Sequence, residues 1–404
     1  MSFAVNCLRP GTAADRVDGE VPPQAAEPDS PEALAAVLAH ASTKGLATVI
    51  RGGGTKLSWG RPPATVDLVV STSRLTRLIA HRHGDLTTTV QAGMTLRDLN
   101  AALSGERQWL PIDSAFDEAT IGGIVATNDS GPSRHRSGTP RDLIIGITLA
   151  LTDGRLVKAG GTVVKNVAGY DLGKLVSGSH GTFAGVADVT FKLVPIPQTS
   201  ATLVASYTDP AALVRDVAAL DASQIEPAAF DIRSEDGEMP LQLKLRVATS
   251  PAARDAQMAA ARAMVSGQAT ILTDMAERDT WEAQVDAPWH GDAAVRFSWL
   301  PSKLPQVLAI FNEIRRDHVS ATLVGRVLGA GLARLSGEAR SLAAAMQRLR
   351  ASSDLGNVVL LRGSHDLKEM VDVWGPPRSS DGALQALKQM FDPAGILNAH
   401  RGPI

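Results

Sequence analysis

Residues 119–194 read ATIGGIVATNDSGPSRHRSGTPRDLIIGITLALTDGRLVKAGGTVVKNVAGYDLGKLVSGSHGTFAGVADVTFKLV, and this stretch decides the fold. Thirteen of its 76 residues are glycine, which is far above what a self-packed core uses. Such a core fills with Leu, Ile and Val, because packed apolar area drives folding. Glycine costs backbone entropy and offers no side-chain contact. The density therefore indicates main chain pressed against a bound ligand, with a series of ordinary turns as the alternative.

The composition is that of a globular, core-forming protein. The chain has 404 residues, 44% of them hydrophobic and 20% charged, and this length predicts two or three domains. A net charge of −2 gives no electrostatic footprint for nucleic acid. Cys7 is the single cysteine, which excludes an internal disulfide framework, a cysteine-ligated iron–sulfur cluster and a multi-thiolate zinc site.

Targeting signals are missing from the sequence. The N-terminus lacks the basic start and apolar core of a secretory signal, and no apolar run approaches the roughly 20 residues that a membrane span needs. We therefore expect a cytoplasmic protein, and peripheral association at the inner face of the cell membrane stays open.

The first part of the chain predicts alternating strands and helices after a loose start. Residues 1–29 show no periodicity and are expected to form a flexible N-terminal arm. Ser30 and Pro31 begin a helix that Gly45 ends. A strand at 47–51 then enters a run of three glycines. Further elements are expected as strands at 66–70 and 86–91 and a helix at 95–103.

Beyond residue 200 the pattern changes to a repeated βαββαβ order, which is the ferredoxin-like arrangement. The first copy is expected as strand 201–207, helix 209–220, strands 227–232 and 241–247, helix 251–266 and strand 269–273. The second is expected as strand 293–299, helix 302–316, strands 320–327 and 331–336, helix 338–352 and strand 357–362. Two such copies can share one antiparallel sheet with helices on one face. The final stretch, 363–404, is expected to return to the first domain.

A glycine loop follows the strand at 47–51. Successive amides at Gly52, Gly53 and Gly54 can converge on an anion, and Thr55 adds a hydroxyl. Arg51 and Lys56 would add positive potential. The lysine comes too early for the GxxxxGK[ST] nucleotide loop. A tight loop without a ligand explains the same residues.

Two more motifs carry small residues. Thr120 can cap a helix whose N-terminus presents the amides of Gly122 and Gly123. The small residues that follow would let a flat ring lie against the main chain, although a helix packed closely on a sheet has the same pattern. Gly178 and Gly181 precede a strand whose backbone could hydrogen-bond a ring edge; the alternative is a helix–strand corner.

Together these motifs resemble a known family. The strings are RGGGTKLSWG, TIGGIVATNDSGPSRHRSGTPRD and VVKNVAGYDLGKLVSGSHGTFAGV, with VDVWGPP and LKQMFDPAGILNAHR near the end. They are similar to the FAD-binding flavoproteins of the vanillyl-alcohol oxidase/p-cresol methylhydroxylase (PCMH) type, and most of all to the FAD-binding subunits of bacterial glycolate oxidases. The resemblance covers nearly the whole chain from about Pro31.

The resemblance implies an α+β fold. A two-part FAD-binding domain of PCMH type would occupy 30–198, completed by the C-terminal segment 363–404. A ferredoxin-like cap of duplicated βαββαβ order would be inserted between them, at 199–362, as the substrate domain.

The resemblance also implies cofactor contacts. The loop would wrap the FAD diphosphate, the second motif would line the flavin and phosphates, and the third would pass beside the ring or ribityl chain. The implied residues are Arg51, Gly52, Gly53, Gly54, Thr55, Lys56, Thr120, Gly122, Gly123, Ala126, Asn128, Gly131, Gly178, Gly181, Val186 and Asn398. Asn398 matches the asparagine of the family's LNPG motif, but Ala399 and His400 replace its Pro-Gly, which leaves the placement of the asparagine open.

Noncovalent FAD is the expected form of the cofactor. Some members of the family tether FAD through a histidine in the diphosphate loop or through a later cysteine. Thr55 stands at the loop position here, and the single cysteine is Cys7.

The sequence offers candidates for some of the groups that oxidation of a substrate needs. Oxidising a 2-hydroxy acid needs a cation for the carboxylate and a base near the hydroxyl. Arg326, Arg362 and His365 are the candidates in the cap, although exposed arginines and histidines are common. The sequence assigns no catalytic residue. It shows no paired histidines with an acidic residue of the kind that holds a metal in related dehydrogenases, so no metal is expected.

The implied function is that of an FAD-binding oxidoreductase subunit that takes part in oxidising glycolate to glyoxylate, or D-lactate. Its partners would be a larger flavin subunit and an iron–sulfur subunit that carries the electrons away. Two other hypotheses stay open: a self-sufficient FAD-dependent oxidase or dehydrogenase of another hydroxylated substrate, and a structural subunit with a vestigial flavin site.

Overall fold

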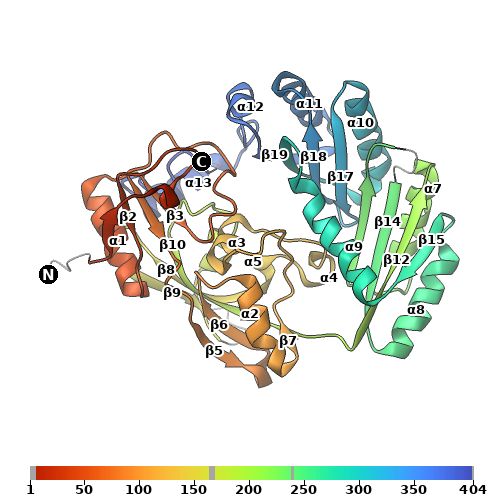
Figure 1. The fold of residues 1–404 in the computed structure, drawn as a ribbon, viewed down its shortest axis with the longest axis horizontal. Helices are drawn as coiled ribbons and strands as arrows, with labels where there is room; N and C mark the ends of the chain where they lie inside the picture. The colour runs from red at the N-terminus through yellow and green to blue at the C-terminus, as the bar shows by residue number, and fades with distance from the viewer. Residues whose placement is uncertain (1–5, 163–168, 238–240, 403–404) are drawn as a thin grey trace. The chain divides into compact units, whose positions relative to one another are not determined.

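The computed structural model describes residues 6–162, 169–237 and 241–402, which form two compact units (Figure 1). The first unit combines the chain up to Ser130 with residues 138–196 and 377–404. The second unit consists of residues 131–137 and 197–376. The first unit is thus assembled from segments near both ends of the sequence.

The described residues of the first unit form three sheets. A four-stranded sheet has the order β1-β2-β4-β3, a five-stranded sheet has the order β5-β6-β10-β8-β9, and β7 pairs with β11. The five-stranded sheet is antiparallel throughout, whereas β4 runs parallel to both of its neighbours. Their bounds are β1 Leu8–Pro10, β2 Gln24–Ala26, β3 Thr48–Arg51, β4 Leu68–Ser71, β5 Leu78–Arg82, β6 Thr87–Gln91, β7 Gln108–Trp109, β8 Ile144–Ala150, β9 Leu156–Gly160, β10 Gly185–Lys192 and β11 Val194–Pro195.

Helices join these sheets through two apolar clusters. Helix α1 buries Leu34, Val37 and Leu38 between the four-stranded sheet and the β8–β10 region. Helices α2 and α3 bury their apolar side chains in a second cluster against β6, β8 and β10. The helices of this unit are α1 Pro31–Lys44, α2 Leu96–Leu103, α3 Ile121–Thr127, α5 Pro140–Leu143, α6 Leu172–Val176 and α13 Asp381–Phe391.

The segment expected as a flexible arm, residues 1–29, forms strands β1 and β2 and a 3-10 turn where the structure describes it. Strand β2 pairs parallel with β4, and β1 pairs with β2. Between them Val17 is buried beside Val49, Val66 and Val69. Three-residue strands are too short to show alternation, so the periodicity argument had no signal to detect there.

The second unit is built on one eight-stranded antiparallel sheet of order β15-β12-β14-β13-β17-β18-β16-β19. Its elements follow the expected βαββαβ order twice. The first set is β12 Thr199–Tyr207, α7 Pro210–Asp221, β13 Ala229–Ser234, β14 Leu241–Thr249, α8 Pro251–Met264 and β15 Gln268–Leu272. The second set is β16 Ala293–Trp299, α10 Leu304–Arg316, β17 Ser320–Arg326, β18 Ala330–Ser336, α11 Ala339–Ala351 and β19 Leu355–Arg362.

The two faces of this sheet differ in chemistry. Helices α7, α8, α10 and α11 cover one face and share a large apolar cluster with it. Helix α9 (Asp274–Asp286), which the sequence did not predict, meets the other face through Glu277, Trp281 and Gln284. These three residues are spaced three or four apart, so they share one side of the helix. They bind buried polar side chains of the strands.

Two short segments lie with the second unit. Residues 363–376 had been expected to return to the first domain, but helix α12 (His365–Met370) buries Leu367 in the sheet's apolar cluster. The return begins at Pro377. Helix α4 (Arg134–Ser137) also belongs here, because His135 stacks edge-on against Phe230.

In the described residues no helix is long and apolar enough to cross a membrane. Short 3-10 turns occur at Ala13–Asp15, His83–Asp85, Ser104–Glu106, Ala287–Trp289 and Pro301–Lys303.

Candidate cofactor site

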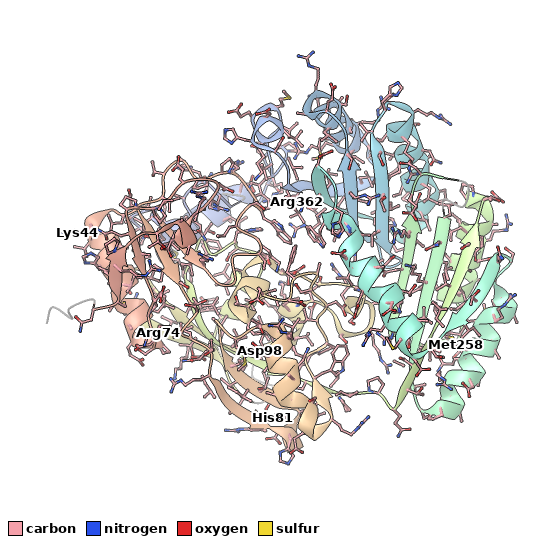
Figure 2. The ribbon with its side chains drawn as sticks, viewed as in Figure 1. Lys44, Arg74, His81, Asp98, Met258 and Arg362 are labelled. Carbon is pink, nitrogen blue, oxygen red and sulfur yellow. The ribbon has the colours of Figure 1, made fainter. Side chains whose placement is uncertain are left out.

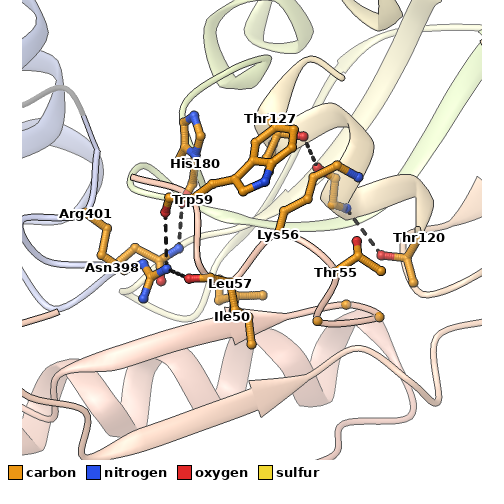
Figure 3. Close-up of a pocket in the computed structure, with 15 residues that line it drawn as sticks. Ile50, Thr55, Lys56, Leu57, Trp59, Thr120, Thr127, His180, Asn398 and Arg401 are labelled. Atoms are coloured by element: carbon orange, nitrogen blue, oxygen red, sulfur yellow. Dashed lines mark hydrogen bonds between the residues drawn. The ribbon is translucent and has the colours of Figure 1, made fainter. Parts of the chain in front are cut away.

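Two adjoining cavities lie in the first unit, at the end of β3, and Figure 3 shows the first of them. The open space inside them, counted with the solvent at their mouths, is about 560 and 410 Å³. The first is lined by Ile50, Gly52, Gly53, Gly54, Thr55, Lys56, Leu57, Trp59, Thr120, Gly123, Ala126, Thr127, His180, Asn398 and Arg401. The second shares six of these residues and adds Thr72, Ala92, Gly122, Gly181, Ala184 and Val186.

The glycine loop is shaped by contacts that only glycine permits. A Cβ on Gly53 would lie 1.8 Å from the carbonyl oxygen of Glu118, and Gly54 has a left-handed φ of +76°. The chain then turns twice, with the Leu57 amide donating to Gly54 at 3.3 Å and the Trp59 amide donating to Lys56 at 3.1 Å. The loop therefore lies tightly against the Glu118 region while its own carbonyls satisfy the next turn.

Four consecutive amides of this loop have no acceptor. Within the described parts of the chain, the N–H groups of Gly53, Gly54, Thr55 and Lys56 donate no hydrogen bond. Backbone donors are normally paired unless water or a ligand supplies the acceptor. A run of free amides beside a cavity is therefore a binding surface for an anion.

Helix α3 supplies a wall of small side chains rather than free amides. The amides of Ile121 and Gly122 donate to the carbonyls of Met94 and Ala92, at 2.9 and 2.8 Å. The Gly123 amide donates to the Thr120 hydroxyl, at 3.4 Å. The expectation that Gly122 and Gly123 present amides to a ligand is therefore wrong. Gly123, Ala126 and Thr127 instead leave room along the cavity.

A buried ion pair fixes the far end of the loop to the residue just beyond α3. Lys56 Nζ lies 3.0 Å from Asp129 Oδ2, and the two side chains are 6% and 11% exposed. The ammonium also lies 5.6 Å from the centre of the Trp59 ring and 5.0 Å from that of Phe116. Ser114 donates its hydroxyl to the same carboxylate oxygen at 3.1 Å. Each charge is thus compensated where it is buried.

The C-terminal segment completes the site. Asn398 lines both cavities and donates through Nδ2 to the His180 carbonyl at 2.6 Å. Its Oδ1 is buried and has no hydrogen-bond partner among the described residues. A Cβ on Gly181 would lie 2.7 Å from Asn398 Nδ2, so glycine is required there. Asn398 thus lies at the site even though Ala399 and His400 replace the family's Pro-Gly.

Two cations anchor this segment. The Arg401 guanidinium donates to the carbonyls of Leu57 and Trp59 and pairs with Asp18 at 3.2 Å. Burial lowers the pKa of Arg401, and the Asp18 carboxylate opposes that shift. Lys388 of α13 donates to Thr182 and Leu397 carbonyls at 2.7 and 2.9 Å. Both anchors hold backbone that borders the cavities.

Four of the expected cofactor residues do not line either cavity. The Arg51 guanidinium donates to the Ala14 carbonyl. Asn128 ends α3 and accepts from the Arg141 amide at 3.3 Å, and the Gly178 amide donates to Val125 at 3.0 Å. Gly131 lies in the second unit.

Several residues that line the cavities were not predicted from the sequence. They are Ile50, Leu57, Trp59, Thr72, Ala92, Thr127, His180, Ala184 and Arg401. Leu57, Trp59, Thr127, His180 and Ala184 lie inside the quoted family strings, and that position was a usable signal. Arg401 was not predictable, since its role depends on the fold bringing the C-terminus to the loop.

The three candidate substrate residues lie apart in the second unit. Arg326 is 3% exposed, with Nε 3.9 Å from Asp231 Oδ2. Arg362, at the end of β19, donates to the carbonyls of Trp289 and Gly291 (Figure 2). His365 is exposed and pairs with Glu369 at 3.1 Å. Arg362 lies on β19, where it pairs in register with Ala294 of β16. Arg326 lies on β17, which is three strands away from β19 in the sheet.

Other charged groups of this unit compensate one another on the α9 side of the sheet. Glu277 accepts from Ser200 and Thr202 and pairs with Arg246 at 2.9 Å. Lys244 donates to Gln284 at 3.0 Å, and burial lowers its pKa to about 8. Among the described residues, no group of three or more His, Cys, Asp or Glu side chains is placed to hold a metal.

Comparison with known proteins shows which proteins this chain is similar to. A family model described as an FAD binding domain matches residues 22–160. Glycolate oxidase subunit GlcD of Bacillus subtilis is 33% identical over 205 residues, which cover 50% of this chain and 44% of that protein. Glycolate oxidase subunit GlcE of Escherichia coli is 34% identical over 179 residues, 44% of this chain and 51% of that protein. The chain spans about half the length of these curated relatives.

One relative is matched over most of its length. D-2-hydroxyglutarate dehydrogenase of Xanthomonas citri pv. viticola is 30% identical over 320 residues, 72% of this chain and 68% of that protein. Among solved structures, alkyldihydroxyacetonephosphate synthase superposes with a TM-score of 0.70 over 94% of this chain and 76% of that one. Its sequence identity is 14%, so this similarity shows the fold alone.

Proposed function

This chain belongs to the family of FAD-linked oxidoreductases that includes the glycolate oxidase flavin subunits, and we propose that it oxidises a small 2-hydroxy acid within a larger complex. Its cofactor is FAD. The observation that supports the proposal best is the pair of cavities bordered by four free amides of the glycine loop.

The residues present fit this cofactor. The amides of Gly53, Gly54, Thr55 and Lys56 would hold the diphosphate, because a phosphate oxygen supplies the acceptor that they lack. The small side chains of Gly123 and Ala126 leave space for flat rings. Asn398 Oδ1 is a buried acceptor without a donor in the described chain, which suits a ligand N–H or O–H group. Of the other expected residues, those that line the cavities and would border the cofactor are Gly52, Thr120, Gly122, Gly181 and Val186.

The cofactor supplies the redox chemistry, since FAD takes up the two electrons that a 2-hydroxy acid loses when it becomes a 2-oxo acid. The protein has to hold the cofactor, bind the substrate carboxylate and accept a proton. We propose that FAD is bound noncovalently, because Thr55 occupies the loop position where some members of the family carry a tethering histidine. Acid precipitation should then release all flavin into the supernatant.

We propose that the second unit is a ferredoxin-like cap that provides the substrate contacts. Arg326 is the strongest of its candidates, because its buried Nε has no hydrogen-bond partner in the described chain and Asp231 is 3.9 Å away. Arginine suits two-point binding of a carboxylate. Arg362 already donates to two carbonyls, and exposed His365 pairs with Glu369.

The proposed partners are a larger flavin subunit and an iron–sulfur subunit. A single cysteine cannot ligate a cluster, so the electrons would leave through another chain. The relatives named as glycolate oxidase subunits support a complex of several chains. A cytoplasmic location, peripheral at the membrane, accords with this proposal.

Anaerobic titration tests the proposed reaction. The purified chain, alone and with its co-purifying subunits, would be mixed with glycolate, D-lactate or D-2-hydroxyglutarate while the flavin absorption is recorded. Bleaching by one of these acids in the complex supports the proposal. Bleaching of the isolated chain at the same rate favours a self-sufficient enzyme. A chain that binds no FAD contradicts both and favours a structural subunit.

A further inference from the structure

The lysine of the glycine loop suggests a role that its sequence position does not reveal. Lys56 is the last residue of the run of free amides that begins at Gly53, and it lines the first cavity. A direct bond from its ammonium to a diphosphate would be the simplest expectation. Its ammonium is instead buried and already paired with Asp129 at 3.0 Å. Two aromatic rings, Trp59 and Phe116, lie within 6 Å of it.

We propose that Lys56 is a positioning residue, which fixes the loop by pairing with Asp129 and leaves the cofactor diphosphate to the backbone amides. This inference rests on FAD being the ligand of the cavities. Under this proposal the neutral backbone amides recognise the diphosphate through hydrogen bonds. Lys56 stabilises the loop, and it does so already in the apo-protein.

The surroundings of the pair support this role. Asp129 follows Asn128, the residue that caps the C-terminus of α3, and the Asp129 amide donates to the Ile124 carbonyl of that helix at 3.1 Å. The Ser114 hydroxyl holds the carboxylate from another side. The pair therefore connects the two walls of the first cavity, the loop and α3, through groups that are themselves fixed.

Electrostatics favours retention of the pair when an anion binds. An ammonium that leaves Asp129 for a diphosphate would leave a carboxylate 11% exposed and uncompensated, which is costly at a buried position. It would also give up the two ring faces, which attract a desolvated cation. The amides of Gly53 to Lys56 need no such exchange, since they have no partner to lose.

A double-mutant cycle on FAD affinity tests the proposal. Lys56→Met, Asp129→Asn and the double variant would be prepared as apo-protein, and the Kd for FAD would be measured from the quenching of flavin fluorescence. If the pair positions the loop, each single change raises the Kd about tenfold and the double change raises it no further, because both remove the same interaction. Melting temperatures of the apo-proteins should fall in parallel, before any cofactor is present.

The opposite assignment gives a different pattern. If Lys56 binds the diphosphate, Lys56→Met weakens FAD binding while Asp129→Asn leaves the Kd unchanged or lowers it, since it frees the ammonium; that pattern overturns the proposal, as does no change in either variant. Wild-type protein that binds no FAD would instead refute the cofactor site itself. Should Asp129→Asn not fold, Ser114→Ala replaces it in the cycle, with an expected rise in Kd of about threefold.

A matched ion pair provides the control. Lys174 and Asp171 pair at 2.8 Å in the same unit, but both side chains are about half exposed and neither lines a cavity. Lys174→Met should leave the Kd for FAD unchanged. Salt gives a second readout: a buried pair is little screened, so the dependence of the wild-type Kd on ionic strength should be the same in Lys56→Met. A weaker dependence in the variant would point to a lost phosphate contact.

Discussion

The glycine loop of the first unit holds exposed or half-buried backbone amides, and the α9-covered face of the second sheet holds buried polar side chains. The two regions satisfy these polar groups in opposite ways. At the sheet face, Glu277 of α9 accepts two hydroxyl hydrogen bonds from strand residues and pairs with Arg246. In the loop, four consecutive amides have no acceptor in the described chain. Groups that satisfy one another stabilise the fold, whereas a run of unsatisfied donors beside a cavity indicates a ligand.

The same contrast appears in residue size. The sheet face is filled by long side chains: Lys244 reaches α9, Arg246 reaches Ser200 on the next strand, and Trp281 of α9 reaches Thr202. The loop region uses Gly53, Gly123 and Ala126, which reach nothing and so leave space. Large polar residues thus close one region, and small residues keep the other open.

The largest effect is expected from adding one methyl group to the loop. In Gly53→Ala the new Cβ would lie 1.8 Å from the Glu118 carbonyl, so the loop must move. We expect a loss of about 3 kcal/mol of unfolding free energy and at least a hundredfold weaker FAD binding. Denaturant unfolding and flavin titration would measure the two effects.

Gly105→Ala is the control for this change, because nothing lies within 4 Å of a Cβ at that position. It should change neither quantity. Normal FAD binding by Gly53→Ala would remove the distinction between loop and sheet.

The second prediction concerns pH and the sheet. Burial lowers the pKa of Lys244 to about 8, below the ordinary 10.5, so the folded state binds fewer protons than the unfolded state above pH 8. This group's contribution to unfolding free energy therefore rises as the pH rises from about 8 to 10.5. Between pH 7.5 and 9.5 the gain is about 2 kcal/mol.

Lys244→Met should abolish that gain. The difference in unfolding free energy between wild type and variant, measured by urea unfolding at both pH values, should change by about 2 kcal/mol in favour of the wild type at pH 9.5. A constant difference would show that Lys244 titrates normally. FAD binding should be the same in both proteins, since Lys244 lies in the other unit.

A smaller effect is expected where the N-terminal arm meets the loop. Asp18→Asn removes the charge that compensates buried Arg401, which holds the carbonyls of Leu57 and Trp59. Asn keeps the left-handed backbone that Asp18 adopts at φ +47°. We expect about fivefold weaker FAD binding, which corresponds to about 1 kcal/mol.

Asp29→Asn is the matched change, since the pair of Asp29 with Arg74 is largely exposed. It should leave the affinity within error of the wild type. Equal effects of the two variants would argue against a role for the arm in the site.

The smallest effect is expected at His365. Its side chain is 69% exposed and pairs only with Glu369 at the surface, so His365→Ala should change the unfolding free energy by less than about 0.5 kcal/mol. The same variant tests the proposed substrate role through kcat and KM for the bleaching acid. A rise in KM without loss of stability would support that role, and unchanged kinetics would exclude it.

The sequence predicted the repeated βαββαβ order and the glycine-rich cofactor region, because hydrophobic periodicity and glycine positions are local signals. It did not predict strands β1 and β2, which are too short to alternate, or helix α9, whose inward side is polar. It could not place Arg401 or the Lys56–Asp129 pair, since both depend on distant segments meeting. It also assigned Gly122 and Gly123 as amide donors, although those amides are used inside the fold.

Hydrogen exchange of the loop amides tests whether the amides of Gly53 to Lys56 bind FAD. With the apo-protein and the FAD complex compared by mass spectrometry, the amides of Gly53 to Lys56 should exchange quickly without FAD and at least tenfold more slowly with it. The amides of Ile121 and Gly122, which already have acceptors, should be slow in both states. Loop amides that exchange at one rate with and without bound FAD would contradict the account.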